Sequence, residues 1–149
     1  MCLPREDVDF DFDYGERMNN EIHEGGCACG AFRFRASGKP RRVSLCHCMT
    51  CRRVHGSAFG AYAIFARDDV EMSGRLETWR SSEEGRRHFC PVCGSVAYME
   101  YASHPEVDLP LGAFDQTGIF EPVYELWCTH REPWLPAGVR TEYPEDRPK

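Results

Sequence analysis

The sequence has no long apolar run. Its 149 residues contain no hydrophobic stretch close to the ~20 residues that span a bilayer, and residues 1–24 are rich in Asp and Glu instead of resembling a signal peptide. These absences predict a soluble, cytoplasmic protein with no membrane partner. Helical periodicity and internal repeats are also scarce, so neither a helical bundle nor a repeat array is expected.

Acidic residues are missing from one part of the chain. The formal net charge is −6, yet residues 25–67 contain no Asp or Glu and eight Lys or Arg, whereas residues 1–24 carry eight acids. A basic stretch of this kind can attract an anionic ligand, or it can balance the negative charge of metal-bound thiolates. Charge patterning alone does not choose between the two interpretations, and both stay open.

Cysteine is abundant, with nine residues, and seven of them form three tight clusters. The clusters read CACG at 27–30, CHCMTC at 46–51 and CPVCG at 90–94. An odd count in a reducing compartment favours metal ligation over disulfides, and thiolates two or three residues apart can reach one zinc ion at roughly 2.3 Å. Seven ligands are one short of two four-cysteine sites. The pattern therefore predicts two zinc ions per chain, one in a closed structural site and one with an open position.

The remaining residues alternate between apolar and polar in short segments that end in glycine-bearing turns. This pattern predicts a mostly β, single-domain fold with strands near 32–35, 43–46, 59–65, 76–79, 95–101, 107–114 and 123–128, and a helical turn at 52–56. We expect an acidic and poorly ordered arm at 1–22, a zinc-binding domain at 23–137 and a tail at 138–149.

The three clusters in this order, from about residue 24 to 136, resemble the glutathione-dependent formaldehyde-activating enzyme (Gfa) family, which includes centromere protein V-like proteins. The resemblance implies a zinc-bearing, Mss4-like assembly of short β-sheets and a carbon–sulfur lyase activity on S-hydroxymethylglutathione. It implies a structural zinc held by Cys27, Cys29, Cys90 and Cys93, and a catalytic zinc held by Cys46, Cys48 and Cys51. One departure is Glu125, where formaldehyde-handling members carry a histidine.

Other side chains near the second cluster are weaker candidates. Arg52 and Arg53 follow Cys51 directly and can hold a substrate carboxylate or screen the thiolates, or they can be purely structural. His55 lies one turn later and can act as an acid or base, although a lone histidine is more often structural. His47 stands between two ligands, so its side chain is expected to point away from the ion.

Three functions compete on this evidence. The favoured one is a zinc-dependent carbon–sulfur lyase acting on a thiol adduct of a small aldehyde, with glutathione or a related small thiol as partner. The second is a non-catalytic, zinc-stabilised module that recognises a polyanion or protein, although the chain lacks the basic helix of nucleic-acid binders. The third is a redox or metal sensor that would release its metal on mild oxidation.

Overall fold

The computed structural model describes residues 21–148. This part of the chain forms eleven strands, one α-helix and three short 3-10 turns. Most of the predicted acidic arm, and Cys2 with it, lies outside the described residues. The prediction of a mostly β, single-domain fold is confirmed. No helix among the described residues has the length and apolarity needed to cross a membrane.

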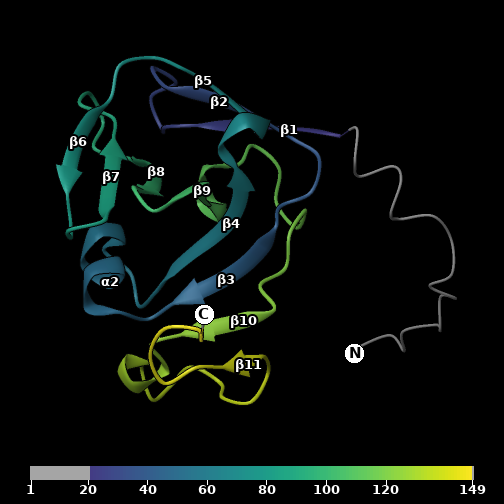
Figure 1. Cartoon of the computed structure of the whole chain (residues 1–149), viewed down its shortest axis with the longest axis vertical. Coiled ribbons are helices and arrows are strands. Elements are labelled where there is room, and N and C mark those ends of the chain that lie inside the picture. The colour runs from purple at the N-terminus through teal and green to yellow at the C-terminus, as the bar shows by residue number, and fades with distance from the viewer. Residues whose placement is uncertain (1–20, 149) are drawn as a thin grey trace, which may run out of the picture.

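The strands form two sheets (Figure 1). The smaller sheet is antiparallel with the order β1-β2-β5, from β1 (Ile22–Gly26), β2 (Arg33–Ser37) and β5 (Val70–Ser73). The larger sheet has the order β11-β10-β3-β4-β9-β8-β7-β6. Its strands are β3 (Arg42–Cys46), β4 (Gly60–Ala66), β6 (Glu77–Arg80), β7 (Gly85–Phe89), β8 (Val96–Tyr101), β9 (His104–Pro110), β10 (Tyr124–Leu126) and β11 (Thr141–Glu142).

The main hydrophobic core lies between the two sheets and is built largely from aromatic rings. Phe34 of β2 meets Phe114 edge-on at 5.0 Å between ring centroids, and Phe65 of β4 meets the same ring at 6.4 Å. Phe34 and Phe65 are almost completely buried. Because burying one such side chain contributes roughly 1.5–3 kcal/mol, this core stabilises the chain independently of any metal.

The opposite face of the larger sheet carries polar side chains near its middle. Arg87 lies opposite Met99, Met99 opposite Asp108, and Asp108 opposite Ile64, so the four strands place these residues in one row. Tyr62 lies two residues before Ile64 and therefore projects from the same face. Arginine, aspartate and tyrosine side chains from distant parts of the sequence thus converge beside the end of β3.

Helix α2 (Met49–His55) begins and ends at residues suited to those positions. Cys48 is its N-cap, and the Cys48 sulfur accepts a hydrogen bond from the Cys51 amide. Gly56 ends the helix at φ 55°, in the left-handed region that favours glycine. The helix starts earlier than the predicted turn at 52–56, because a thiol can cap a helix although the sequence rules for N-caps emphasise Ser, Thr, Asp and Asn.

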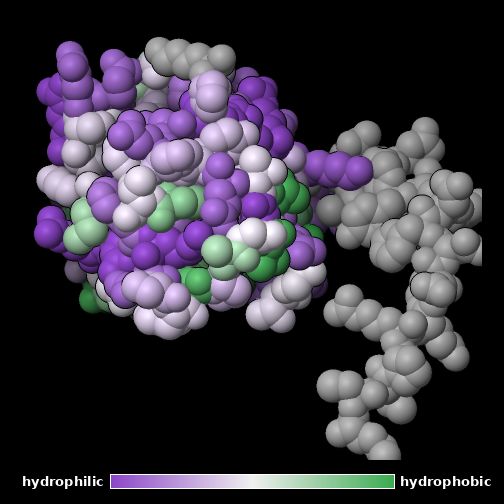
Figure 2. Space-filling model, turned by 90° about the horizontal axis from the view of Figure 1, so that it is seen from below, coloured by the Kyte–Doolittle hydropathy of each residue, from purple (hydrophilic) through white to green (hydrophobic). Residues whose placement is uncertain are grey.

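The C-terminal segment adds a strand to the sheet instead of trailing away from it. β11 pairs with β10, which in turn runs parallel to β3. The Trp127 indole donates to Asp146 at 2.9 Å. This hydrogen bond fixes the chain after β11 beside the cysteines of residues 46–51. Hydrophilic residues predominate on the face seen from below in Figure 2, and apolar residues form small separate groups there. The predicted division at residues 22 and 137 stays a prediction.

Candidate metal centres and their surroundings

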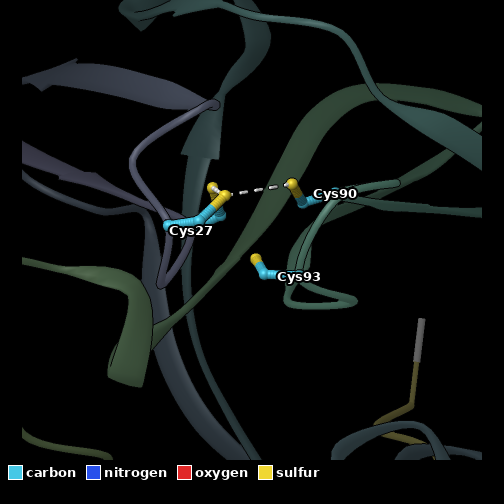
Figure 3. A group of neighbouring side chains, drawn as sticks. Cys27, Cys90 and Cys93 are labelled. Carbon is cyan, nitrogen blue, oxygen red and sulfur yellow. Dashed lines mark hydrogen bonds between the residues drawn. The ribbon is translucent and has the colours of Figure 1, made fainter.

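Four cysteines from two distant segments meet at one end of the molecule. The sulfurs of Cys27, Cys29, Cys90 and Cys93 all lie within 4.8 Å of one another. Cys27 and Cys29 come from the β1–β2 loop and the other two from the turn after β7. Figure 3 shows the side chains of Cys27, Cys90 and Cys93 pointing toward one another. The Cys27–Cys29 and Cys29–Cys90 sulfur distances are 3.5 and 3.7 Å. Tetrahedral zinc–thiolate geometry requires about 3.8 Å, so the donor set fits a closed zinc site.

Backbone and hydroxyl groups support this four-cysteine cluster. The Phe32 amide donates to the Cys27 sulfur at 3.2 Å, and Cys93 lies 3.2 Å from the Ser95 hydroxyl. Hydrogen bonds from Ser95 lower the pKa of Cys93 to about 5. Gly94, at φ 75°, provides the left-handed residue that turns the chain just after Cys93. Such donors stabilise thiolates, as metal ligation requires.

Three further cysteines meet where β3 passes into α2. Cys46 ends the strand, Cys48 caps the helix and Cys51 lies in its first turn, and their sulfurs also lie within 4.8 Å of one another. Hydrogen bonds with the thiols of Cys46 and Cys51 hold the pKa of Cys48 well below its usual range. The described residues bring no fourth cysteine to this group. It therefore fits a zinc site that leaves one position to another ligand.

The three-cysteine cluster forms part of the wall of a cavity of about 440 Å³. Arg87, Tyr62 and Asp108 of the larger sheet form other parts of this wall, and Trp127 and Asp146 border it from the C-terminal side. A cavity of this volume lies within the range of small-molecule sites. Arg87 and Asp108 are not predicted from the sequence, because no local motif marks them and only the strand order brings them to the cysteines.

The comparisons with known proteins agree with this geometry. The sequence model of the family described as glutathione-dependent formaldehyde-activating enzyme matches residues 22–130, which include all seven clustered cysteines. The chain belongs to this family. The match runs from β1 to the 3-10 turn Cys128–His130. The Gfa domain thus contains the four-cysteine cluster, the three-cysteine cluster and ten of the eleven described strands, while β11 lies beyond the matched residues.

Two curated relatives of this Gfa family member are similar over part of their length. An uncharacterized lyase of Schizosaccharomyces pombe is 32% identical over 81 residues, which cover 54% of this chain and 59% of the yeast protein. A putative glutathione-dependent formaldehyde-activating enzyme of Halomonas elongata is 34% identical over 101 residues, covering 60% of this chain and 63% of the bacterial protein. The matched regions span less than two thirds of each relative.

A solved structure supports the fold. The crystal structure of a Rhodobacter sphaeroides protein superposes with a TM-score of 0.50 and covers 65% of this chain and 90% of its own, at 20% sequence identity. At this level of identity the similarity concerns the fold alone.

The two arginines predicted to contact substrate do not line the cavity of this Gfa domain. Arg52 forms an ion pair with Glu132 and donates to the His130 carbonyl at 3.0 Å, so it links α2 to the C-terminal segment. Arg53 is exposed on the helix. Both border a separate surface depression beside Trp134. Direct contact of either arginine with a substrate stays a prediction.

His55 lies between two cavities. Its Nε2 is 2.7 Å from the Tyr62 hydroxyl, and Tyr62 lines the cavity of the three cysteines. His55 itself lines a second, more open cavity of about 640 Å³ that extends toward Cys27. Burial lowers the pKa of His55, so its imidazole is neutral over a wider pH range than usual. Its influence on the three-cysteine cluster passes through Tyr62.

His47 belongs to a buried charged network on the other side of the ligand segment. Its Nε2 lies 2.8 Å from a carboxylate oxygen of Glu125, which also pairs with Arg140 at 3.1 Å and Arg131 at 3.5 Å. Cys128 lies close enough to join His47 and Glu125 as a potential metal group. Two arginines already neutralise the carboxylate, however, so this group suits a structural role better than a third cation.

Replacing Glu125 with alanine is expected to destabilise the chain by about 3–5 kcal/mol, because it leaves Arg140 and the His47 ring facing a buried position without their carboxylate, while Arg131 keeps its ion pair with Glu142. Glu125 is only 2% exposed. Thermal unfolding followed by circular dichroism measures the effect. The matched control is Glu121→Ala, on an exposed residue of the preceding loop, which should change stability by less than about 0.5 kcal/mol. Equal melting temperatures for the two variants would contradict the structural role of Glu125.

Proposed function

We propose that this chain is a carbon–sulfur lyase acting on a thiol adduct of a small aldehyde, with S-hydroxymethylglutathione as the representative substrate. The observation that carries the proposal is the group of three cysteines in the wall of a cavity of about 440 Å³, with no fourth cysteine among the described residues. The family description and the names of the two relatives support the same reaction class.

The donor set of each cluster favours zinc. Thiolates select zinc among the common divalent ions of cells, and both groups of sulfurs lie close enough together to share one ion. We assign Cys27, Cys29, Cys90 and Cys93 to a structural zinc, and Cys46, Cys48 and Cys51 to a second one. When bound at the three-cysteine cluster, zinc supplies affinity for a soft sulfur and the charge withdrawal that favours a thiolate over a thiol.

Besides a site for the sulfur, the reaction needs a cavity that holds the adduct and a group that exchanges a proton. In the cleavage direction the hydroxyl of the S–CH₂–OH group loses its proton, its oxygen forms the C=O bond of formaldehyde, and the C–S bond breaks with its electron pair leaving on sulfur. Addition is the reverse. The cavity walls hold the adduct and limit its exposure to water, and a group that exchanges the hydroxyl proton is required.

Asp108 is the side chain best suited to exchange that proton. It lies in the same row of the sheet as Arg87 and borders the cavity of the three cysteines. Burial raises the pKa of Asp108 to about 7, although the positive charges of Arg42 and Arg87 oppose the shift and Glu106 adds to it. A carboxyl that titrates near neutral pH can accept the proton during cleavage and return it during addition.

We expect Asp108→Asn to lower the cleavage rate by about 10²-fold and to remove an inflection near pH 7 from the pH–rate profile. In the parent protein this inflection is a rise with pH, because the carboxylate is the form that accepts a proton. The amide cannot ionise, and burying a neutral amide costs less free energy than burying a charged carboxylate, so the variant should remain folded at pH 7. A parent profile without this inflection, or an unchanged rate in the variant, would contradict the role of Asp108.

The proposed activity is tested by exchange NMR on a mixture of glutathione and carbon-13 formaldehyde. The full-length protein is expected to accelerate interconversion between free formaldehyde and the glutathione adduct well above its spontaneous rate. A mixture with oxidised glutathione, which has no thiol, provides the control and should show no exchange. An exchange rate equal to the spontaneous one at stoichiometric protein would refute the proposal.

The basic stretch does not favour the alternative of a polyanion-binding module. Several of its arginines form ion pairs with carboxylates from other segments, namely Arg33 with Asp115, Arg35 with Glu24, Arg41 and Arg42 with Glu106, and Arg52 with Glu132. Paired arginines offer less positive charge to a phosphate backbone than free ones do. These pairs favour internal charge balance over an anion-binding surface.

A further inference from the structure

Within residues 21–148, side chains from outside the three-cysteine cluster donate hydrogen bonds to one of its three sulfurs, that of Cys51. The Tyr62 hydroxyl donates to it at 3.4 Å and Arg87 Nη2 donates at 3.5 Å. Cys48 instead accepts a backbone amide at 3.3 Å. The cluster is therefore asymmetric: one of its three thiolates lies against a permanent positive charge and a hydroxyl.

Arg87 has few other partners for its charge. Its side chain is 5% exposed, it forms no ion pair with a carboxylate within the described residues, and its Nε has no hydrogen-bond partner there. Its other hydrogen bond goes to the Tyr62 hydroxyl at 3.4 Å. A buried guanidinium needs compensating negative charge, and the thiolate cluster is the negative group it contacts directly.

The hydrogen atoms around Tyr62 define the direction of this network. The phenol has a single proton, which is donated to the Cys51 sulfur. Arg87 Nη1 donates to the phenol oxygen. The 2.7 Å contact with His55 is then a second hydrogen bond to this oxygen, donated by the Nε2–H of a neutral imidazole. Two donors on its oxygen hold the phenol in place and strengthen its own hydrogen bond to sulfur.

The net charge of the metal-bound cluster suggests what the hydrogen bonds from Arg87 and Tyr62 achieve. Three thiolates outweigh the charge of one divalent ion by about one negative charge, and a fourth, substrate thiolate raises the excess to about two. In a buried site this excess opposes binding of the substrate sulfur. The guanidinium of Arg87 removes about one unit of it, and hydrogen bonds to Cys51 reduce the electron donation of that sulfur.

We propose that Arg87 and Tyr62 are positioning residues that withdraw charge through Cys51, so that the three-cysteine centre accepts a fourth, anionic sulfur. The inference rests on the proposed function for its substrate, a small-molecule thiol, but the charge withdrawal is a property of the cluster itself. It can therefore be measured with and without a thiol.

The test uses the full-length protein with cobalt(II) in place of zinc, in the parent and in Arg87→Met and Tyr62→Phe. We expect the sulfur-to-cobalt charge-transfer band to move to lower energy in both variants without any thiol, because Cys51 becomes more electron-rich. The dissociation constant for glutathione, read from the cobalt spectrum, should rise about 10-fold or more in Arg87→Met and less in Tyr62→Phe. Arg87→Lys keeps the charge and should recover part of the affinity.

Arg75→Met is the matched control, because it removes an exposed arginine of the turn before β6, away from the cavity, and should change neither quantity. Unchanged band energies in both variants would overturn the inference, even if the protein proves to be a lyase. If the bands move but the parent protein neither binds glutathione nor accelerates adduct exchange, the charge withdrawal stands and the proposed function fails. Circular dichroism identifies a variant that has unfolded, and Tyr62→Phe then decides the outcome because it changes only one oxygen.

Discussion

Replacing Cys90 with serine is expected to unfold most of the chain at 37 °C. Cys90 is fully buried, and its cluster joins segments 61 residues apart in the sequence. Structural zinc sites contribute about 10–16 kcal/mol at neutral pH, which is comparable to the whole stability of about 5–15 kcal/mol of a typical domain. Serine is a poor zinc ligand, so the variant loses most of this contribution.

Thermal unfolding and zinc content measured on the same preparation test this expectation. The control is Cys128→Ser, which changes a half-buried cysteine outside both clusters and should shift stability by about 1 kcal/mol or less. If Cys90→Ser melts within a few degrees of the parent, the four-cysteine cluster is not a structural metal site, and the aromatic core between the sheets is sufficient for folding.

Replacing Cys48 with serine is expected to reduce adduct exchange by about 10³-fold or more while leaving the fold intact. The change removes one of the three proposed zinc ligands, and with it the sulfur site on which the proposed reaction depends. Cys48 is also the N-cap of α2, and serine is among the best N-cap residues, so the helix should begin at the same place. The experiment therefore separates chemistry from stability.

Cys48→Ser is measured by exchange NMR beside Cys128→Ser, which retains every proposed ligand. Full activity in Cys48→Ser would contradict the assignment of the reaction to the three-cysteine cluster. Loss of activity together with a lower melting temperature would show that this cluster also carries the fold.

The cysteine pairs were accessible from the sequence because each lies in a short segment whose geometry is local. In CACG and CPVCG the cysteines are two or three residues apart, and the glycine after the second cysteine marks a turn. The grouping of Cys29 with Cys90 came from family resemblance, and it brings together two segments that are 61 residues apart in the sequence. The alternation of residues 43–46 likewise predicted β3 because period two is a property of one strand.

The surroundings of the three-cysteine cluster could not be predicted in this way. Arg87 reaches Cys51 because β7 is placed three strands away from β4, and Asp108 reaches the cavity because β9 lies beside β4. Strand order depends on which hydrophobic faces pack together and not on a local motif. The parallel pairing of β3 with β10 is equally non-local, and it is this pairing that places Glu125 near His47.

Glu125, the residue that departs from the family pattern, has a physical explanation in its contacts. The position of His47 between two cysteines predicts a side chain that points away from the ion. Its imidazole contacts Glu125. The carboxylate balances Arg131 and Arg140 in the same network. A histidine at position 125 could not balance the charge of Arg140, so in this chain the residue is explained by buried charge and not by contact with the cavity.

We propose that the chain holds two metal sites of different kinds, one closed and one open to a substrate. The most direct test is the zinc content per chain of the parent and of Cys48→Ser, purified in parallel and measured with their circular dichroism spectra. We expect two zinc ions in the parent and one in the variant, with unchanged spectra. One zinc ion in both proteins, or loss of both ions in the variant, would contradict it.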